Sequence, residues 1–312
     1  MERRKPPISE KYFPAVLGHE KQKRFFVTAL TTQRLAHAYL LSGEAHLGKT
    51  TFALSLARWL LCTDSNTTRP CGACQSCRLP IENNPDLKFS DEVTALGVEE
   101  IRMVQEQLSL SAFSSGRKIL IVSRVERLSD QACQALLKFL EEPDASTNIV
   151  LTTDNPGALP ATLRSRAQIV RFPKVSDQIV QLALDRFSID GDLKKRILKI
   201  ARGAIGVALH LASDPQAVEA NLRLQAWHED MLIASRVERL VRGEQLLKEH
   251  SDDLGHFLQD WLSYAAMTTG QGTESSTRGV ALRLCGGLLA AQRLLDQSVN
   301  KRLVLNNLLL EF

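Results

Sequence analysis

The chain has 312 residues, of which 44% are hydrophobic and 24% charged, a composition that is ordinary for a globular protein of two or three domains. Its 39 basic and 35 acidic residues give a net charge of +4, which is too small to indicate nucleic-acid binding by itself. The N-terminal "MERRKPPISE" lacks the apolar core of an export signal, and no apolar run is long enough to cross a bilayer. These features predict a cytoplasmic protein that does not enter the membrane.

In the first half of the chain, short apolar strands alternate with helical patterns. A short helix running into a further strand closes this half at 158–172. Such alternation predicts an α/β fold with a mostly parallel sheet and helices on both faces. The other predicted strands cover 37–43, 117–122 and 147–153, and the predicted helices cover 49–61, 97–110 and 129–143.

After Pro173 the strand patterns stop and helical patterns dominate. The segment "SDPQ" at 213–216 has the composition of a linker between two helical parts. We therefore predict three domains, at 1–172, 173–214 and 215–312, of which the last two are helical.

Residues 43–50, "GEAHLGKT", match the eight-residue phosphate-binding loop, with a predicted strand before it and a helix after it. The backbone amides between Gly43 and Gly48 would bind phosphate oxygens. Lys49 would reach the outer phosphates, and the Thr50 hydroxyl would bind Mg²⁺. The alternative is a glycine turn that serves only to pack the helix.

The second predicted strand of this nucleotide site lacks the usual acids. Hydrolysis needs a carboxylate that holds Mg²⁺ and a base that orients water, but Ser123 and Arg124 follow "KILIV". Glu126 lies three residues past the strand, so we expect its side chain to point elsewhere. The sequence predicts binding without hydrolysis, unless another segment supplies acids, for which Asp91 and Asp154 are candidates.

Four of the six cysteines lie close together with the spacing C-x8-C-x2-C-x2-C. In a chain without an export signal this clustering favours a metal over disulfides, and four thiolates satisfy tetrahedral zinc with no open position. We predict a structural zinc module at about 62–80, with redox-active cysteines or an iron–sulfur cluster as alternatives. Cys133 and Cys285 lie on apolar helix faces and are predicted core residues. The four predicted zinc ligands are Cys62, Cys71, Cys74 and Cys77.

Several motifs together resemble the delta-prime subunits of the bacterial DNA polymerase III clamp loader, a family within the AAA+ proteins. The resemblance covers nearly the whole chain and is weakest from 217 to about 295. Besides the cysteines, the motifs are "HAYLLSGEAHLGKTTFALSLARWLLC" (37–62), "NNPDL" (83–87), "QALLKFLEEP" (134–143), "LTTDNPGALPATLRSRAQIVRF" (151–172) and "NKRLVLNNLLLEF" (300–312).

This resemblance implies an AAA+ domain with a zinc insertion, a small helical lid domain and a helical collar that holds subunits in a ring. The implied partners are gamma/tau and delta subunits in a hetero-pentamer, the sliding clamp, and primed DNA contacted through the complex. Gamma/tau-type subunits hydrolyse ATP, whereas delta-prime is a stator that need not. The chain would then belong to a DNA polymerase holoenzyme, although nothing in it resembles a polymerase active site.

The resemblance also assigns single residues. In "LRSRA", Arg166 corresponds to the arginine that enters the neighbouring subunit's ATP site, an arginine finger in trans, although Ala167 replaces the family's cysteine. The alternative for Arg166 is an ordinary surface ion pair. Active members carry a nucleotide-sensing arginine where this chain has Gly206, and Arg202 lies four residues too early. Thr152 and Thr153 match the family's first sensor.

Two other functions are compatible with a phosphate loop. One is a gamma/tau-type ATPase that hydrolyses ATP itself, against which Ser123, Arg124 and Gly206 argue. The other is an AAA+ remodeller outside replication, against which the cysteine module and the "LEEP" and "LRSRA" motifs argue.

Overall fold

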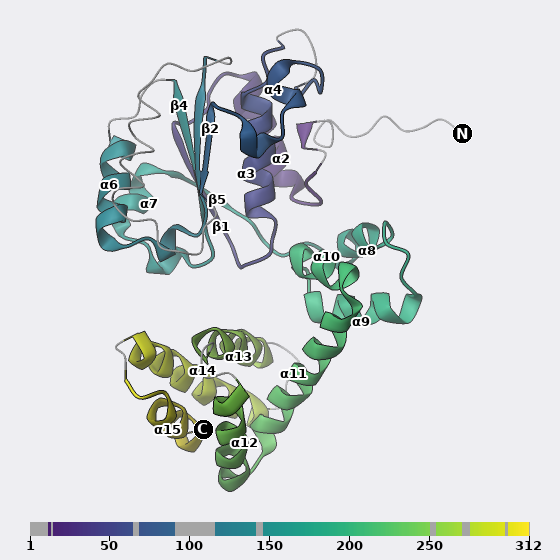
Figure 1. Ribbon diagram of the computed structural model, residues 1–312, viewed down its shortest axis with the longest axis vertical. Coiled ribbons are helices and arrows are strands. Elements are labelled where there is room, and N and C mark those ends of the chain that lie inside the picture. Colours follow the sequence, from purple (N-terminus) through teal and green to yellow (C-terminus); the bar gives the residue numbers. More distant parts are fainter. Residues whose placement is uncertain are drawn as a thin grey trace. The chain divides into compact units, whose positions relative to one another are not determined.

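The computed structural model describes residues 12–13, 15–64, 69–90, 116–141, 146–249, 254–269, 275–296 and 299–311. It divides into two compact units, Met1–Asp214 and Pro215–Phe312 (Figure 1). We call them unit 1 and unit 2 and describe each by itself.

Unit 1 contains a five-stranded parallel sheet with the order β2-β3-β4-β1-β5 (Figure 1). The strands predicted at 37–43, 117–122 and 147–153 are confirmed as β1, β3 and β4, and β5 lies inside 158–172. The sequence patterns missed β2, the short strand beside β3. The bounds are β1 Ala38–Ser42, β2 Leu87–Ser90, β3 Lys118–Val122, β4 Thr147–Thr153 and β5 Gln168–Arg171.

Helices cover both faces of the sheet, as the alternating pattern predicted (Figure 1). Alternate residues of β1 point to opposite sides because side chains alternate along a strand. Tyr39 packs in one core with Phe26 and Phe52, whereas Leu40 packs in the other with Leu136. The first face carries α2 (Glu20–Thr31) and α3 (Lys49–Leu60), and the second carries α6 (Asp130–Glu141) and α7 (Ala161–Arg166). The predicted helix at 97–110 lies outside the described residues.

The remaining short elements of unit 1 include the helices after Pro173, where the expected change to helical structure is found. The lid helices are α8 (Asp177–Leu184), α9 (Gly191–Ala201) and α10 (Ile205–Ser213). The others are α4 (Gln75–Arg78) and the 3₁₀ turns η1 (Ile81–Asn83), η2 (Val125–Arg127) and η3 (Pro156–Ala158).

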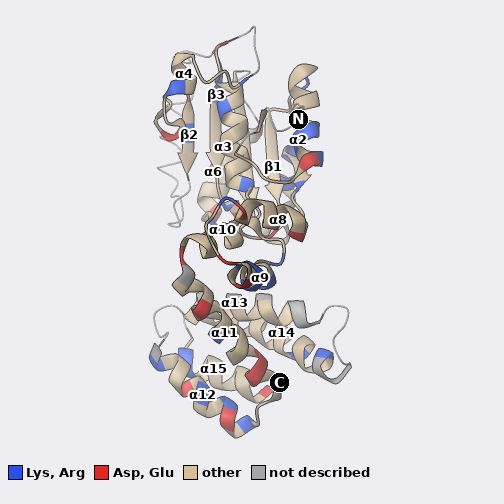
Figure 2. Ribbon diagram, turned by 90° about the vertical axis from the view of Figure 1, so that its right-hand side faces the viewer, with Lys and Arg blue, Asp and Glu red and all other residues tan. Residues whose placement is uncertain are grey.

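Unit 2 is helical in its described residues, in agreement with the pattern from 217 onward. Its core contains Trp261, Leu284, Leu288 and Leu305. Lys and Arg are interspersed with Asp and Glu along its helices in Figure 2. The helices are α11 (Pro215–Ile233), α12 (Arg236–Glu249), α13 (Leu254–Thr268), α14 (Ser275–Asp296) and α15 (Lys301–Glu311).

The junction between the units is shorter than predicted. The division between the units falls inside the linker predicted at 213–216, but α10 ends at Ser213 and α11 begins at Pro215, so Asp214 alone separates the two helices. Proline is well tolerated at the first position of a helix, which explains why the "DP" pair starts α11 instead of a loop. Among the described residues, no helix has the length and apolar character needed to span a membrane.

Candidate nucleotide-binding and metal sites

The loop at 43–50 has the backbone of a phosphate cradle. It connects the carboxyl end of β1 to α3, which begins at Lys49. Gly48 has a φ of 83°, a backbone conformation that is strained for any residue with a side chain. A Cβ at Gly43 would collide with the Phe172 carbonyl oxygen, so this position requires glycine. Both glycines of the motif are therefore required by the backbone geometry of the loop.

The Lys49 side chain is directed into the loop and is only 5% exposed. Its Nζ donates to the carbonyl oxygens of Gly43, at 2.8 Å, and Glu44, at 2.5 Å. The same ammonium lies 2.7 Å from Oδ1 of Asp154, just past β4. Asp154, one of the two acids that the sequence left open, thus lies at the cradle. Asp91 lies outside the described residues.

The carboxyl end of β3 brings a hydroxyl group to the cradle. Ser123 Oγ lies 3.4 Å from Thr50 Oγ1, within reach of a weak hydrogen bond. Arg124 adopts a left-handed backbone with a φ of 51°, and its amide donates to Thr152 Oγ1 at 3.1 Å. Ser123 and Arg124, which replace the acids, are therefore held by backbone and hydroxyl contacts at the carboxyl ends of the strands.

Glu126 does reach the carboxyl ends of the strands, contrary to our expectation. The left-handed Arg124 leads directly into the 3₁₀ turn η2, which redirects the chain. Glu126 Oε1 accepts a hydrogen bond from the Asp154 amide at 3.0 Å, and its Oε2 is buried without a hydrogen-bond partner among the described residues. Asp154 and Glu126 are thus two carboxylates near the loop, and spacing along the chain gave no signal for the second.

Two further contacts on the loop were not predicted. His19 Nε2 donates to the Leu47 carbonyl oxygen at 2.8 Å, and burial lowers the pKa of His19. From the lid, the Gly206 amide donates to the His46 carbonyl oxygen at 2.8 Å. A Cβ at Gly206 would lie 2.9 Å from that same oxygen. The position expected to lack a sensor arginine is therefore in direct contact with the loop backbone.

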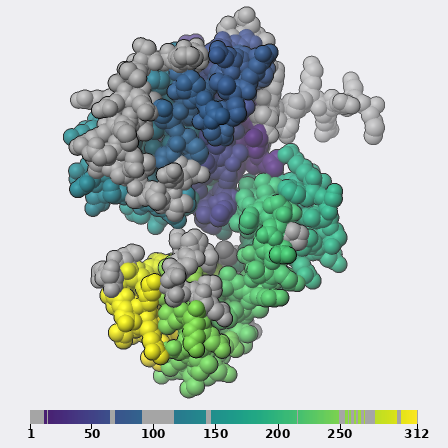
Figure 3. Space-filling model, in the orientation of Figure 1, coloured from purple at the N-terminus to yellow at the C-terminus, as the bar shows by residue number. Residues whose placement is uncertain are grey.

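The four clustered cysteines form a site whose donor set suits zinc. Their Sγ atoms all lie within 4.8 Å of one another, and sulfurs around a tetrahedral zinc would be about 3.8 Å apart, given Zn–S bonds of about 2.3 Å. Cys62 follows α3 and Cys77 lies in α4, so the site connects α3 to the inserted segment, which lies at the surface of unit 1 (blue in Figure 3).

The thiol pKa values within the cluster differ. Burial raises the pKa of Cys77 to about 12. Burial also acts on Cys74, but hydrogen bonds from Thr63 outweigh it and lower that pKa to about 6. A bound metal would displace the remaining thiol protons. All six cysteines are free thiols, and the expected core positions of Cys133 and Cys285 are confirmed, the first buried and the second half-buried.

Arg166, the predicted finger, ends α7 and is paired within its own chain. Its Nη2 lies 2.6 Å from Glu141 Oε1, and its Nη1 donates to the Thr162 carbonyl oxygen at 3.0 Å. About a third of the Arg166 side chain, 35%, is exposed. Glu141 belongs to "LEEP", so two of the characteristic motifs meet in this ion pair.

The sequence is similar to subunits of DNA polymerase III. The family model described as "DNA polymerase III, delta subunit" matches residues 18–176, just over half of the chain. The DNA polymerase III subunit delta' of Yersinia pestis is 31% identical over 75% of this chain and 69% of that protein. In Bacillus subtilis, subunit delta' is 28% identical over 66% of this chain and 63% of that protein, and subunit tau is 28% identical over 79% and 45%. The chain thus spans less than two thirds of either Bacillus relative.

A solved structure shares the fold. A mutant of RuvB from Thermotoga maritima superposes with a TM-score of 0.50 at 15% identity, covering 86% of this chain and 89% of that one. This likeness, the parallel sheet and the phosphate loop agree with the predicted AAA+ fold. By its sequence, this chain belongs to the DNA polymerase III delta subunit family.

Proposed function

We propose that this chain is a clamp-loader subunit of the delta-prime type, which helps to place a sliding clamp on primed DNA without hydrolysing ATP itself. The observation that carries the proposal is the end of β3, where Ser123 Oγ lies 3.4 Å from Thr50 Oγ1. A hydroxyl and a guanidinium there replace the carboxylates that hydrolysis needs. The names of the delta' relatives support the same role.

In this proposal the loop remains a static nucleotide site. The backbone from Gly43 to Gly48 and the Lys49 ammonium would hold the phosphates, and Thr50 would bind Mg²⁺. The cysteine site would hold structural Zn²⁺. The chain would work in the cytoplasm, in a ring with gamma/tau and delta subunits, and Arg166 would act on the ATP of a neighbouring subunit.

The first test is ATP binding and hydrolysis by the purified chain with Mg²⁺. We expect no turnover above the rate without protein, whether or not ATP binds. Lys49→Ala would then abolish any binding, whereas Lys199→Ala, which removes an exposed lysine of α9, would leave it unchanged. Turnover that disappears in Lys49→Ala would make the chain a motor subunit and overturn the proposal.

A gamma/tau-type ATPase is the second candidate. The observation in its favour is the pair of carboxylates near the loop, since Asp154 Oδ1 lies 2.7 Å from Lys49 Nζ and Glu126 binds the Asp154 amide. If these groups held Mg²⁺ and water, turnover would be present and would be lost in both Asp154→Asn and Glu126→Gln. The relatives include a tau subunit at the same 28% identity as a delta' subunit, so this comparison does not separate the two.

A further inference from the structure

A cavity of about 360 Å³ opens at the end of the sheet where the strands begin. His37 precedes β1, Arg117 precedes β3 and Thr147 begins β4. The phosphate loop follows the carboxyl end of β1, so the two sites lie at opposite ends of the parallel strands. The volume is at the lower end of the range for small-molecule pockets, roughly 300–1,000 Å³.

The charged groups that line this cavity are cationic. Among the described residues, its lining includes the guanidinium groups of Arg69 and Arg117 and no carboxylate. Arg69 is fixed in place because its Nε donates to the Asp64 carbonyl oxygen at 2.6 Å and its guanidinium lies 5.6 Å from the centre of the Trp59 ring. Arg117 Nη1 donates to Asn148 Oδ1 at 3.2 Å. Both cations are thus positioned before any ligand arrives.

Two lining residues each carry a buried polar atom that has no hydrogen-bond partner among the described residues. One is the hydroxyl of Thr147, a residue only 2% exposed, and the other is the indole Nε1 of Trp59. Buried polar groups in native proteins are nearly always paired, so unpaired ones call for an explanation. Indole and guanidinium nitrogens can only donate, and a hydroxyl can donate. The missing partner of these two atoms is therefore a hydrogen-bond acceptor, and the guanidiniums of the lining favour one that carries negative charge.

We propose that this cavity binds a small anion through a phosphate or carboxylate group whose oxygens accept hydrogen bonds from Trp59 Nε1, the Thr147 hydroxyl and the two guanidiniums. The apolar side chains of the lining, Leu30, Leu35 and Leu60, would cover the rest of an organic ligand. The site is independent of the phosphate loop and of the proposed clamp-loader function.

Trp59 gives a local readout in the full-length chain. The sequence has three tryptophans, so a protein with ¹⁵N-labelled indoles shows three side-chain signals. Inorganic phosphate and, separately, malonate would be titrated into it. We expect the Trp59 signal to shift and saturate, while those of Trp227 and Trp261, in unit 2, stay in place. A response to phosphate alone, or to malonate alone, would identify which oxyanion the site takes.

Variants of the lining test the geometry. Arg69→Gln and Arg117→Gln should each weaken the affinity about tenfold or more, the usual size for loss of a charge-assisted hydrogen bond. Arg78→Gln, which changes an exposed arginine of α4 outside the cavity, should leave the affinity unchanged. Thr147→Val preserves the shape, so it should weaken anion binding while raising the melting temperature, because it removes an unpaired buried hydroxyl.

If neither phosphate nor malonate produced a saturable shift of the Trp59 signal, the proposal would be overturned. An equal shift in the Arg69→Gln, Arg117→Gln double variant would also overturn it, because binding would then occur elsewhere. Thr147→Val also distinguishes a purely structural role: unchanged affinity in a stabilised protein would exclude the hydroxyl as a ligand contact and contradict the geometry proposed here.

Discussion

Lys49 contacts three oxygen atoms of its own chain, and one of them belongs to a carboxylate. The Gly43 and Glu44 carbonyl oxygens are part of the loop, whereas Asp154 comes from the end of β4. Phosphate groups that bind in the loop would compete with Asp154 for the same ammonium. The Lys49–Asp154 ion pair therefore opposes nucleotide binding in this conformation, and the side chain of Asp154 sets the strength of that opposition.

Replacing Asp154 by asparagine should tighten nucleotide binding. The Asp154 side chain is 29% exposed, so solvent weakens the ion pair and a gain of about three- to tenfold in affinity is expected. Isothermal titration with ATP in the absence of Mg²⁺ would measure it. Asp177→Asn, at an acid in the first turn of α8, is the control. If the variant instead bound ATP more weakly than wild type when Mg²⁺ was present, Asp154 would be a metal ligand. That result would contradict competition between Asp154 and the phosphate groups for Lys49.

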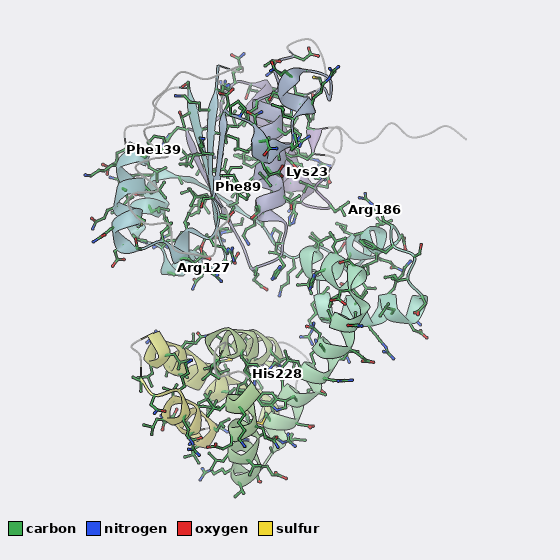
Figure 4. The ribbon with its side chains drawn as sticks, in the orientation of Figure 1. Lys23, Phe89, Arg127, Phe139, Arg186 and His228 are labelled. Carbon is green, nitrogen blue, oxygen red and sulfur yellow. The ribbon has the colours of Figure 1, made fainter. Side chains whose placement is uncertain are left out.

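His228 belongs to α11 in unit 2 (Figure 4) and packs against aromatic side chains of α13. Its ring is stacked on Trp261 at 6.0 Å with an interplanar angle of 5°, and lies 4.8 Å from Tyr264. Neither ring nitrogen has a hydrogen-bond partner among the described residues. Burial lowers the pKa of His228 from 6.5 to about 4, so the folded protein holds the neutral imidazole.

This pKa makes the stability of unit 2 fall in mild acid. The unfolded chain takes up the proton at about pH 6.5 and the folded chain only at about pH 4, so stability is complete above the first value and is lost as the pH falls toward the second. The full loss would be about 3 kcal/mol. Urea unfolding at several pH values should show a smaller acid loss for His228→Phe than for wild type. His210→Gln, at an exposed histidine, should keep the wild-type slope.

At the residue scale, sequence reasoning located some groups and missed others. The phosphate loop and the cysteine cluster were predictable because their function imposes fixed spacings on neighbouring residues. The contacts of His19 with Leu47 and of Glu126 with Asp154 join residues 28 positions apart in each case, and no local pattern records them. Asp154 was a candidate by residue type, but only the fold brings it to Lys49.

At the scale of elements, burial explains which strands and helices were predictable. Strands β1, β3 and β4 are buried along their whole length, and each contains an apolar run in the sequence, although that of β4 is only "IVL". Strand β2, at the edge of the sheet, has one buried residue followed by three half-buried ones, and "LKFS" gives no such run. The linker at 213–216 was located correctly but predicted too long, because "DP" favours both a turn and the start of a helix.

The cysteine module is an element whose stability should depend on metal. Four thiolates in a closed tetrahedral site predict one Zn²⁺ per chain, measured by mass spectrometry of the metal content. Cys74→Ser should lose the metal and lower the melting temperature, because it leaves α4 without its anchor to the end of α3. Cys285→Ser, in α14, should retain the metal. Iron in the purified protein, or a disulfide among these residues, would contradict a zinc site.

At the scale of the whole molecule, contacts divide the chain after Asp214, so the predicted lid at 173–214 groups with the AAA+ part and not with the collar. The Gly206–His46 hydrogen bond is one reason, because it joins α10 directly to the phosphate loop. The boundary at 172 between the first two predicted domains stays a prediction. Arg166 ends α7 beside Glu141. If this chain contributes to the ATP site of a neighbouring subunit, as proposed, the contributing element is therefore α7.

The last prediction concerns that assembly. In a complex reconstituted with gamma/tau and delta subunits, Arg166→Ala should lower the ATPase rate about a thousandfold at the one site it would serve, because a finger in trans is worth at least that much. Assembly, measured by gel filtration, should be unchanged, and the isolated chain should show no difference. Arg164→Ala, on the same helix, is the matched control. Glu141→Gln releases the Arg166 guanidinium from its ion pair, so the ATPase rate of the complex should equal or exceed that of the wild-type complex. Loss of activity in Glu141→Gln equal to that in Arg166→Ala would instead mean that the ion pair is the functional unit, and Arg166 would not be a finger.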